Sequence, residues 1–263
     1  MNAPRLQSQR RRKAQRYRLR ALQRRRGGRG SPRRAARPMA LLETAFMLAL
    51  PTRRDWREHL TITAGDQGSC QSCSAFAIAA AVRLRSEIGR RPVALEPGYL
   101  HTCIGMPGTR DRGTICATPN DPGVLLERLR DRGWRTGAND DHPYPASACQ
   151  VGGTRNQLSD VRKIYSEAEA KQALADGPLV AEMRMPPEFP NFRGKVFRVA
   201  AGFDRPLHTV CVIGHDATGW IILNSMGGGW GDGSGFTTIP YGLCGLLVFR
   251  RGIATLGAYA PML

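Results

Sequence analysis

The sequence predicts an α+β protein of two lobes, a helical N-terminal lobe and a β-rich C-terminal lobe, with a functional cleft between them. Two observations lead to this fold class. Ala-rich or periodic apolar patterns typical of helices occupy the chain up to residue 177. Beyond Pro178 the pattern changes to short apolar or alternating runs separated by Gly and Pro, which is typical of strands.

Three segments of the first part are predicted to be helical. An Ala-rich run begins near Cys73, contains no Gly or Pro, and stops at Gly89, so it should form a buried helix of about four turns. The range 121–133 has a Pro in its first turn, several apolar residues and a final Gly, which indicates a second helix. A Ser cap and a final Gly bound the third helix, 166–177.

Six segments of the second part are predicted to be strands, because each is a short apolar or alternating run bounded by turn residues. They are 178–185, 194–199, 207–216, 219–226, 234–242 and 244–252.

The net charge of +18 belongs mainly to one end of the chain. Residues 1–37 hold 15 of the 39 Lys and Arg and no acidic residue, so the remainder has 24 basic and 21 acidic residues. Low apolar content and charge repulsion predict that this arginine-rich tail is disordered. Such a tail can bind nucleic acid or another anionic surface, but the absence of a motif favours a solvated leader.

A short apolar stretch, 38–50, follows the tail. It resembles a signal peptide, although Glu43 interrupts it, and it is too short to span a bilayer. We expect a short apolar leader or a pro-like segment before a main domain at 51–263. Since no other segment approaches the length of a transmembrane helix, we expect no integral membrane span.

Two cysteines, Cys70 and Cys73, precede the long helix in "DQGSCQSCSAFAIAAAVRLR". A structural zinc site usually needs a second pair of ligands, and a thioredoxin-like redox pair needs a parallel α/β unit, so both readings are weak. A thiol at a helix N-terminus is favoured as thiolate, which makes Cys73 a candidate nucleophile. Gln67 could then donate to an oxyanion, but an imidazole partner is still required.

Three separated motifs carry a resemblance to papain-like cysteine peptidases. "LPTRRDWREHLTITAGDQGSCQSCSAF" is similar to the mature start of that family. "PLHTVCVIGHD" supplies His208, 135 residues beyond Cys73, and "GWIILNSMGGGWGDGSGF" supplies Asn224, 151 residues beyond it. The similarity runs from about Leu50 to Cys244, and the short upstream region is typical of the family's compact bacterial members.

The resemblance implies a function and a role for each candidate residue. The protein would be a cysteine endopeptidase that hydrolyses peptide bonds through a thioester acyl-enzyme, with protein or peptide substrates. Cys73 would be the nucleophile, His208 its base and later its acid, Asn224 the residue that orients the imidazole, and Gln67 part of the oxyanion hole. No metal or organic cofactor is implied, and we expect a monomer.

The resemblance also implies two disulfides, Cys70–Cys116 and Cys103–Cys149. Each would stabilise the helical lobe by about 2–5 kcal/mol, and both would place the protein in an oxidising compartment, secreted or periplasmic. Cys211 and Cys244 have no matching partner, so we expect both to be buried free thiols.

The sequence departs from the family pattern at several positions. Ser74 replaces the aromatic residue that follows the nucleophile, and Met226 replaces the Trp that shields the His–Asn hydrogen bond. The range 117–123 stands where the family has a Gly-Gly edge that binds substrate backbone. Leu207 suggests an apolar wall for the main specificity pocket.

Three further hypotheses stay open, and the departures around the cleft motivate the first of them. The same fold could perform deamidation or transpeptidation as a secreted effector. A non-catalytic nucleic-acid-binding protein could use the arginine-rich tail, 1–37. The segment 38–50 could also occupy the cleft and inhibit the protein.

Overall fold

The computed structural model describes most of the chain beyond residue 50. The described residues are 51–59, 63–137, 149, 152–198, 206–250 and 253–263. They belong to the unit Phe46–Leu263, and the predicted tail and apolar leader lie outside them. Within the described residues, every helix is too short or too polar to cross a membrane.

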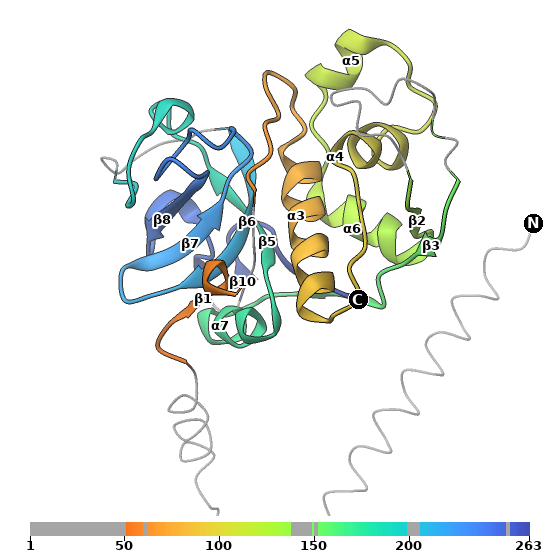
Figure 1. Cartoon of the computed structure of the whole chain (residues 1–263). Helices are drawn as coiled ribbons and strands as arrows, with labels where there is room; N and C mark the ends of the chain where they lie inside the picture. The colour runs from red at the N-terminus through yellow and green to blue at the C-terminus, as the bar shows by residue number, and fades with distance from the viewer. Residues whose placement is uncertain (1–50, 60–62, 138–148, 150–151, 199–205, 251–252) are drawn as a thin grey trace, which may run out of the picture. The chain divides into compact units, whose positions relative to one another are not determined.

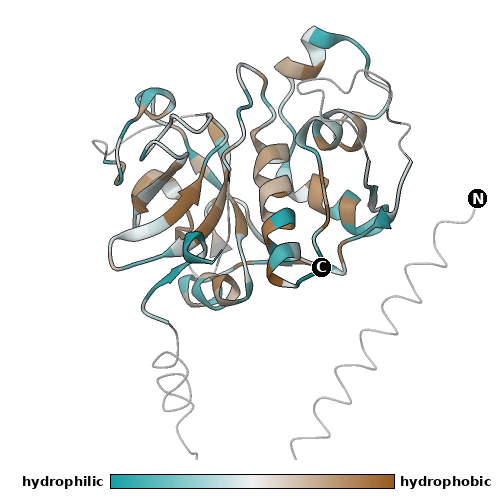
Figure 2. Cartoon of the chain, viewed as in Figure 1, coloured by the Kyte–Doolittle hydropathy of each residue, from teal (hydrophilic) through white to brown (hydrophobic). Residues whose placement is uncertain are grey.

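The three predicted helices are confirmed. Helix α3 (Cys73–Ile88) runs to a terminal Gly89, and its first half is the more hydrophobic (Figure 2). Helix α6 (Pro122–Asp131) is capped by Asp121, whose side chain accepts a hydrogen bond from the Val124 N–H. Helix α7 (Glu167–Asp176) begins after a capping Ser, as its sequence predicts.

Six shorter helical segments among the described residues were not predicted, because three to six residues are too few to show a helical period. They are η1 (Trp56–Glu58), α4 (Pro97–Tyr99), η2 (Leu100–Ile104), α5 (Arg112–Ala117), η3 (Phe189–Asn191) and η4 (Leu243–Gly245).

One antiparallel sheet forms the second lobe, with strand order β4-β11-β5-β6-β7-β8 and β1 paired to the far end of β6. Its strands are β1 (Arg54–Asp55), β4 (Asp160–Lys163), β5 (Leu179–Arg184), β6 (Leu207–His215), β7 (Gly219–Leu223), β8 (Phe236–Pro240) and β11 (Ala258–Met262). Two small ribbons pair β2 (Trp134–Arg135) with β3 (Arg155–Asn156) and β9 (Phe249–Arg250) with β10 (Ile253–Ala254).

Four of the six strand predictions are confirmed by β5, β6, β7 and β8. The prediction for 194–199 is wrong, since its described residues form only an isolated bridge between Val196 and Thr238. The prediction for 244–252 is largely wrong, because β9 is the only strand among the described residues of that range. Cys244 and Leu247 adopt left-handed backbone conformations, with φ of 56° and 48°, which a strand cannot contain.

The sheet separates two apolar cores. On one face it packs against α3, which lies between the sheet and helices α4 and α6 (Figure 1). On the other face it packs against α7 and the loops that carry Phe189, Phe197 and Trp230. Along β6, Cys211 and Ile213 belong to the first core while Val210 and Val212 belong to the second, the alternation expected of a buried strand. The two-lobed α+β class is therefore confirmed.

Candidate active site

Helix α3 places Cys73 at its first residue, where the N–H groups of the first turn have no partner within the helix. The thiol is free and partly exposed. The helix is held against β6 by apolar packing, so the position of the sulfur is fixed by the core rather than by a loop. The helix end favours an anionic sulfur there.

Strands β6 and β7 bring His208 and Asn224 together. His208 is the second residue of β6, and Asn224 directly follows β7, its antiparallel neighbour. The Nε2 atom of His208 lies 2.7 Å from Oδ1 of Asn224, and both side chains are buried. Because an amide oxygen can only accept, Nε2 carries a proton and donates it, which leaves Nδ1 of the neutral ring as an acceptor.

The pKa of the Cys73 thiol reflects opposing effects. Burial alone would raise this pKa, but a hydrogen bond from His208, the charge of its ring and hydrogen bonds from Thr209 together lower it to about 7. A substantial fraction of the sulfur is therefore thiolate near neutral pH, which is the reactive form. The contact also shows that Cys73 and His208 meet across the two lobes.

Gln67 lies in the loop before α3 and is tied to the residue after Asn224. Its backbone N–H donates to the carbonyl of Ser225 over 2.8 Å, and its side-chain oxygen accepts from the Ser225 hydroxyl over 2.6 Å. Its amide nitrogen donates to the carbonyl of Cys70 over 2.7 Å. One amide hydrogen is committed by that bond, and the second is available to another acceptor.

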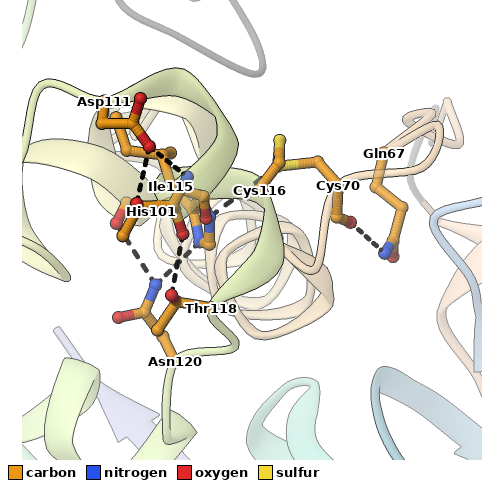
Figure 3. Close-up of a disulfide and its surroundings, with 9 residues drawn as sticks. Gln67, Cys70, His101, Asp111, Ile115, Cys116, Thr118 and Asn120 are labelled. Atoms are coloured by element: carbon orange, nitrogen blue, oxygen red, sulfur yellow. Dashed lines mark hydrogen bonds between the residues drawn. A yellow bond between two sulfur atoms is a disulfide. The ribbon is translucent and has the colours of Figure 1, made fainter.

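A disulfide links this loop to the segment that precedes α6 (Figure 3). Cys70 is bonded to Cys116, and His101 lies beside the bridge, with Nε2 3.0 Å from the carbonyl of Ile115. The Nδ1 atom of His101 accepts from the amide of Asn120 over 2.7 Å. The bridge and the buried imidazole thus fix the Gln67 loop and the Asn120 segment together.

The second implied disulfide, Cys103–Cys149, is also present. Cys211 is free and buried, as expected, and burial strongly raises the pKa of its thiol. Cys244 is free but only half-buried, which corrects the expectation that it is buried; burial raises the pKa of its thiol to about 11. Of these free thiols, Cys73 is the one with a lowered pKa.

Several residues of the site were not predicted. The ring of Phe189 packs edge-on against His208 with 5.7 Å between ring centroids, and Trp230 donates to the Phe189 carbonyl over 2.7 Å. Phe189 therefore covers the imidazole and Trp230 packs against Phe189, whereas Met226 packs at the margin of the same core. Phe189 lies in an irregular segment, so no periodicity could have singled it out; Thr209 is recognisable only as the residue after His208.

A cavity of about 530 Å³ reaches the site at Asn224, but Cys73, His208 and Gln67 do not line it. Its walls are the 76–87 face of α3, the loop 92–97, and the residues Thr209, Asn224 and Ser225. Its surface is both polar and apolar. Among the described residues, no group of three or more His, Cys, Asp or Glu side chains could hold a metal ion.

Comparison with known proteins places this geometry in a family context. The family described as "Papain family cysteine protease" matches residues 50–247. Ananain from Ananas comosus is 28% identical over 231 residues, which cover 80% of this chain and 63% of ananain. Papaya proteinase 4 from Carica papaya is 28% identical over 197 residues, covering 70% of this chain and 54% of the relative. The chain thus spans less than two thirds of either relative.

Solved structures show the same fold. The cysteine protease CMS1MS2 of Carica candamarcensis, in complex with E-64, superposes with a TM-score of 0.63 at 24% identity, over 81% of this chain and 99% of the other. The bromelain protease of Ananas comosus, in complex with E64, gives a TM-score of 0.62 at 20% identity, over 81% and 100% of the two chains. At these identities the comparison supports the fold alone.

Proposed function

Because the chain belongs to the papain family of cysteine proteases, we propose that it is an endopeptidase that hydrolyses peptide bonds through a Cys73–His208–Asn224 triad. The observation that carries this proposal is the contact of His208 with two partners at once, the Cys73 thiol and the Asn224 amide oxygen. A nucleophile, a base and a group that orients the base are the parts that this chemistry requires.

The hydrogen bond to Asn224 defines how the imidazole would act. With Nε2–H donating to Asn224, Nδ1 can take the proton of the Cys73 thiol. The resulting thiolate attacks the carbonyl carbon of the substrate, and the C–N bond breaks as His208 returns the proton to the leaving amine. Water then adds to the thioester carbonyl with His208 as base, and the C–S bond breaks to release the acid and restore the thiol.

The negative charge on the substrate oxygen requires donors. The second amide hydrogen of Gln67 and the backbone N–H of Cys73 are suited to this role, because the latter lies in the first turn of α3. The Ser225 hydroxyl donates to the oxygen of the Gln67 amide. This bond fixes which end of the amide is the oxygen, and the NH₂ group at the other end remains the donor. Removal of such a donor typically lowers kcat by about 10²–10³.

The wall next to His208 indicates the substrate class. Leu207 is half-exposed, at 52% of its full surface, immediately before His208 on β6. A solvent-facing leucine beside a reactive site favours an apolar substrate side chain over a charged one. We therefore expect cleavage next to apolar residues in peptides and unfolded proteins.

The disulfides bear on where the protein works. Both bridges fit an oxidising compartment. A secreted or periplasmic location remains our proposal. The domain boundaries, the role of the arginine-rich tail and the inhibition hypothesis for 38–50 concern residues outside those that the structure describes.

A product analysis tests the proposal. The full chain and its Cys73→Ala variant are incubated with an unfolded protein, and the products are analysed by mass spectrometry. We expect new termini created by the wild type and none by the variant. Intact substrate whose Gln residues gain about one mass unit would instead indicate deamidation, and joined peptides would indicate transpeptidation.

Chemical labelling tests the nucleophile separately. A thiol-directed epoxysuccinyl inhibitor should label Cys73 and abolish cleavage. Label on Cys211 or Cys244, with Cys73 unmodified, would contradict the assignment.

A further inference from the structure

Two hydroxyl side chains directly follow two of the candidate catalytic residues. Ser74 follows Cys73 on α3, and Thr209 follows His208 on β6. Their hydroxyl oxygens lie 3.0 Å apart, and both side chains are buried. Helix α3 and strand β6 therefore meet beside the sulfur through a hydrogen-bonded pair, Ser74 and Thr209. Apolar side chains would be expected at such buried positions.

The direction of the hydrogen bonds in this pair follows from counting protons. The Ser74 oxygen lies 2.7 Å from the backbone carbonyl of Asn120, and a carbonyl can only accept. A hydroxyl has one hydrogen, so the Ser74 hydrogen is committed to Asn120. In the Ser74–Thr209 contact, the Thr209 hydroxyl must therefore be the donor.

The accepting carbonyl is held in place. The Asn120 side chain donates to Nδ1 of His101 over 2.7 Å and also contacts the His101 carbonyl at 3.2 Å. His101 is fully buried beside the Cys70–Cys116 disulfide. These contacts hold Asn120 in place, so its carbonyl stays within reach of the Ser74 hydroxyl. Asn120 is the fixed end of the series of hydrogen bonds that runs through Ser74 and Thr209.

The other end of this series of hydrogen bonds is the sulfur of Cys73. Thr209 makes hydrogen bonds to Cys73 through its backbone N–H and through its hydroxyl. While Cys73 is a thiol, its S–H is directed to His208, and the Thr209 hydroxyl can donate to Ser74, which donates to Asn120. When Cys73 is a thiolate, the single Thr209 hydrogen has two acceptors, the sulfur and the Ser74 oxygen, and the charged acceptor forms the stronger bond.

We propose that Thr209 is a positioning residue of the reaction, whose hydroxyl proton stabilises the Cys73 thiolate, and that Ser74 competes with the sulfur for that proton. This inference rests on the proposed function of Cys73 as the nucleophile. The titratable group that faces Cys73 from β6 is His208, and Thr209 and Ser74 add neutral dipoles beside it.

The competition predicts shifts of opposite sign. Thr209→Val keeps the shape of the side chain but removes the donor, so the pKa of Cys73 should rise by about one unit. Ser74→Ala removes the competing acceptor and frees the Thr209 proton for the sulfur, so the pKa of Cys73 should fall. Thr209→Ser keeps the hydroxyl and should restore the wild-type value.

The experiment measures the rate at which iodoacetamide alkylates Cys73, mapped to the residue by mass spectrometry, across the neutral and alkaline pH range. The full-length wild type and the three variants are compared without substrate. We expect the midpoint for Thr209→Val above, and that for Ser74→Ala below, the wild-type midpoint. Equal midpoints, or shifts of both variants in one direction, would overturn the inference.

Two controls separate the possible failures. Circular dichroism checks that each variant is folded. If Thr209→Val does not fold, Thr209→Ala replaces it, since it also lacks the hydroxyl donor and should also raise the pKa of Cys73. If the Cys73→Ala variant still hydrolyses peptides, the proposed function is wrong. If the wild type requires Cys73 but the opposite shifts are absent, only the role of Thr209 and Ser74 is wrong.

Discussion

The amide oxygen of Asn224 accepts a hydrogen bond of 2.7 Å from Nε2 of His208, joining the residue after β7 to the start of β6. Both side chains are buried, and the edge of Phe189 packs against the imidazole. The orientation of the ring is therefore set by two paired strands and an aromatic contact. As a result, Nδ1 is directed toward the helix that carries Cys73.

Asn224→Ala should lower kcat by about 10- to 100-fold, because the Nε2–H of a buried ring loses its acceptor at a cost of about 1–3 kcal/mol. The KM should change much less, since no substrate contact is removed. Steady-state kinetics on a peptide substrate measures both. An unchanged kcat in a folded Asn224→Ala variant would mean that this bond does not orient the base.

The two disulfides provide a matched pair for mutation. Cys70–Cys116 and Cys103–Cys149 each span 46 residues, so loss of either should reduce stability by a similar amount, about 4 kcal/mol from chain entropy. Only Cys70–Cys116 is linked to the Gln67 loop. Replacing Cys70 and Cys116 by Ala should therefore also lower kcat.

The Cys103/Cys149 double Ala variant is the control for that prediction. Chemical denaturation should give similar losses for both variants, whereas kcat of the folded fraction should fall only without Cys70–Cys116. Equal effects on kcat would show that the bridge near Gln67 has no specific link to the site.

Arg85 is a buried cation that joins α3 to the end of α7. Its guanidinium lies 3.1 Å from the carbonyl of Pro178, 3.3 Å from that of Gly177 and 3.4 Å from that of Ala173. Burial lowers the pKa of Arg85 to about 10, so it stays charged at neutral pH. Arg85→Met should destabilise the fold by about 2–4 kcal/mol, because several buried carbonyls lose their donor.

A second arginine of the same helix is the control. Arg83 is mainly exposed and pairs with Glu87 one turn later at 2.9 Å. Arg83→Met should change the free energy of unfolding by no more than about 0.5 kcal/mol. Denaturant titration compares the two, and similar losses would contradict the role of Arg85 as the donor to the end of α7.

His215, at the end of β6, should make the fold sensitive to acid. Both ring nitrogens are buried without a hydrogen-bond partner among the described residues. Burial, and then the charge of Lys171, lower its pKa below 6.5, with Arg54 acting in the same direction and Asp216 and Glu167 opposing. A lowered pKa means that the unfolded chain takes up the proton first, so this stability is present above pH 6.5 and lost as the pH falls.

Comparison of wild type with His215→Leu measures that effect. The free energy of unfolding should fall less steeply below pH 6.5 in the variant, where the buried site cannot be protonated. Parallel pH profiles for the two proteins would mean that His215 does not contribute to acid sensitivity.

Long segments with a clear period could be predicted from the sequence, and irregular ones could not. The helix that begins at Cys73, strand β6 with His208 and strand β7 just before Asn224 follow from the apolar pattern and from Gly and Pro boundaries. The segment 244–252 is apolar enough for a strand, but left-handed residues at Cys244 and Leu247 interrupt it, and neither residue type signals such a conformation.

Some residues of the candidate site could likewise be predicted from the sequence, and others could not. Cys73, His208, Asn224 and Gln67 could be named because each lies in a motif. Phe189 could not, because its contact with His208 depends on a long-range fold of an irregular segment. Ser74 could be recognised as a departure, but its hydrogen bond to Asn120 depends on packing between α3 and the segment before α6.

The most direct test of the central claim is the pH dependence of Cys73 alkylation in the wild type and in His208→Ala. With the imidazole present, the midpoint should lie near pH 7; without it, burial should move the midpoint upward by more than one unit. A wild-type midpoint near 9, unchanged in His208→Ala, would contradict a thiolate maintained by His208.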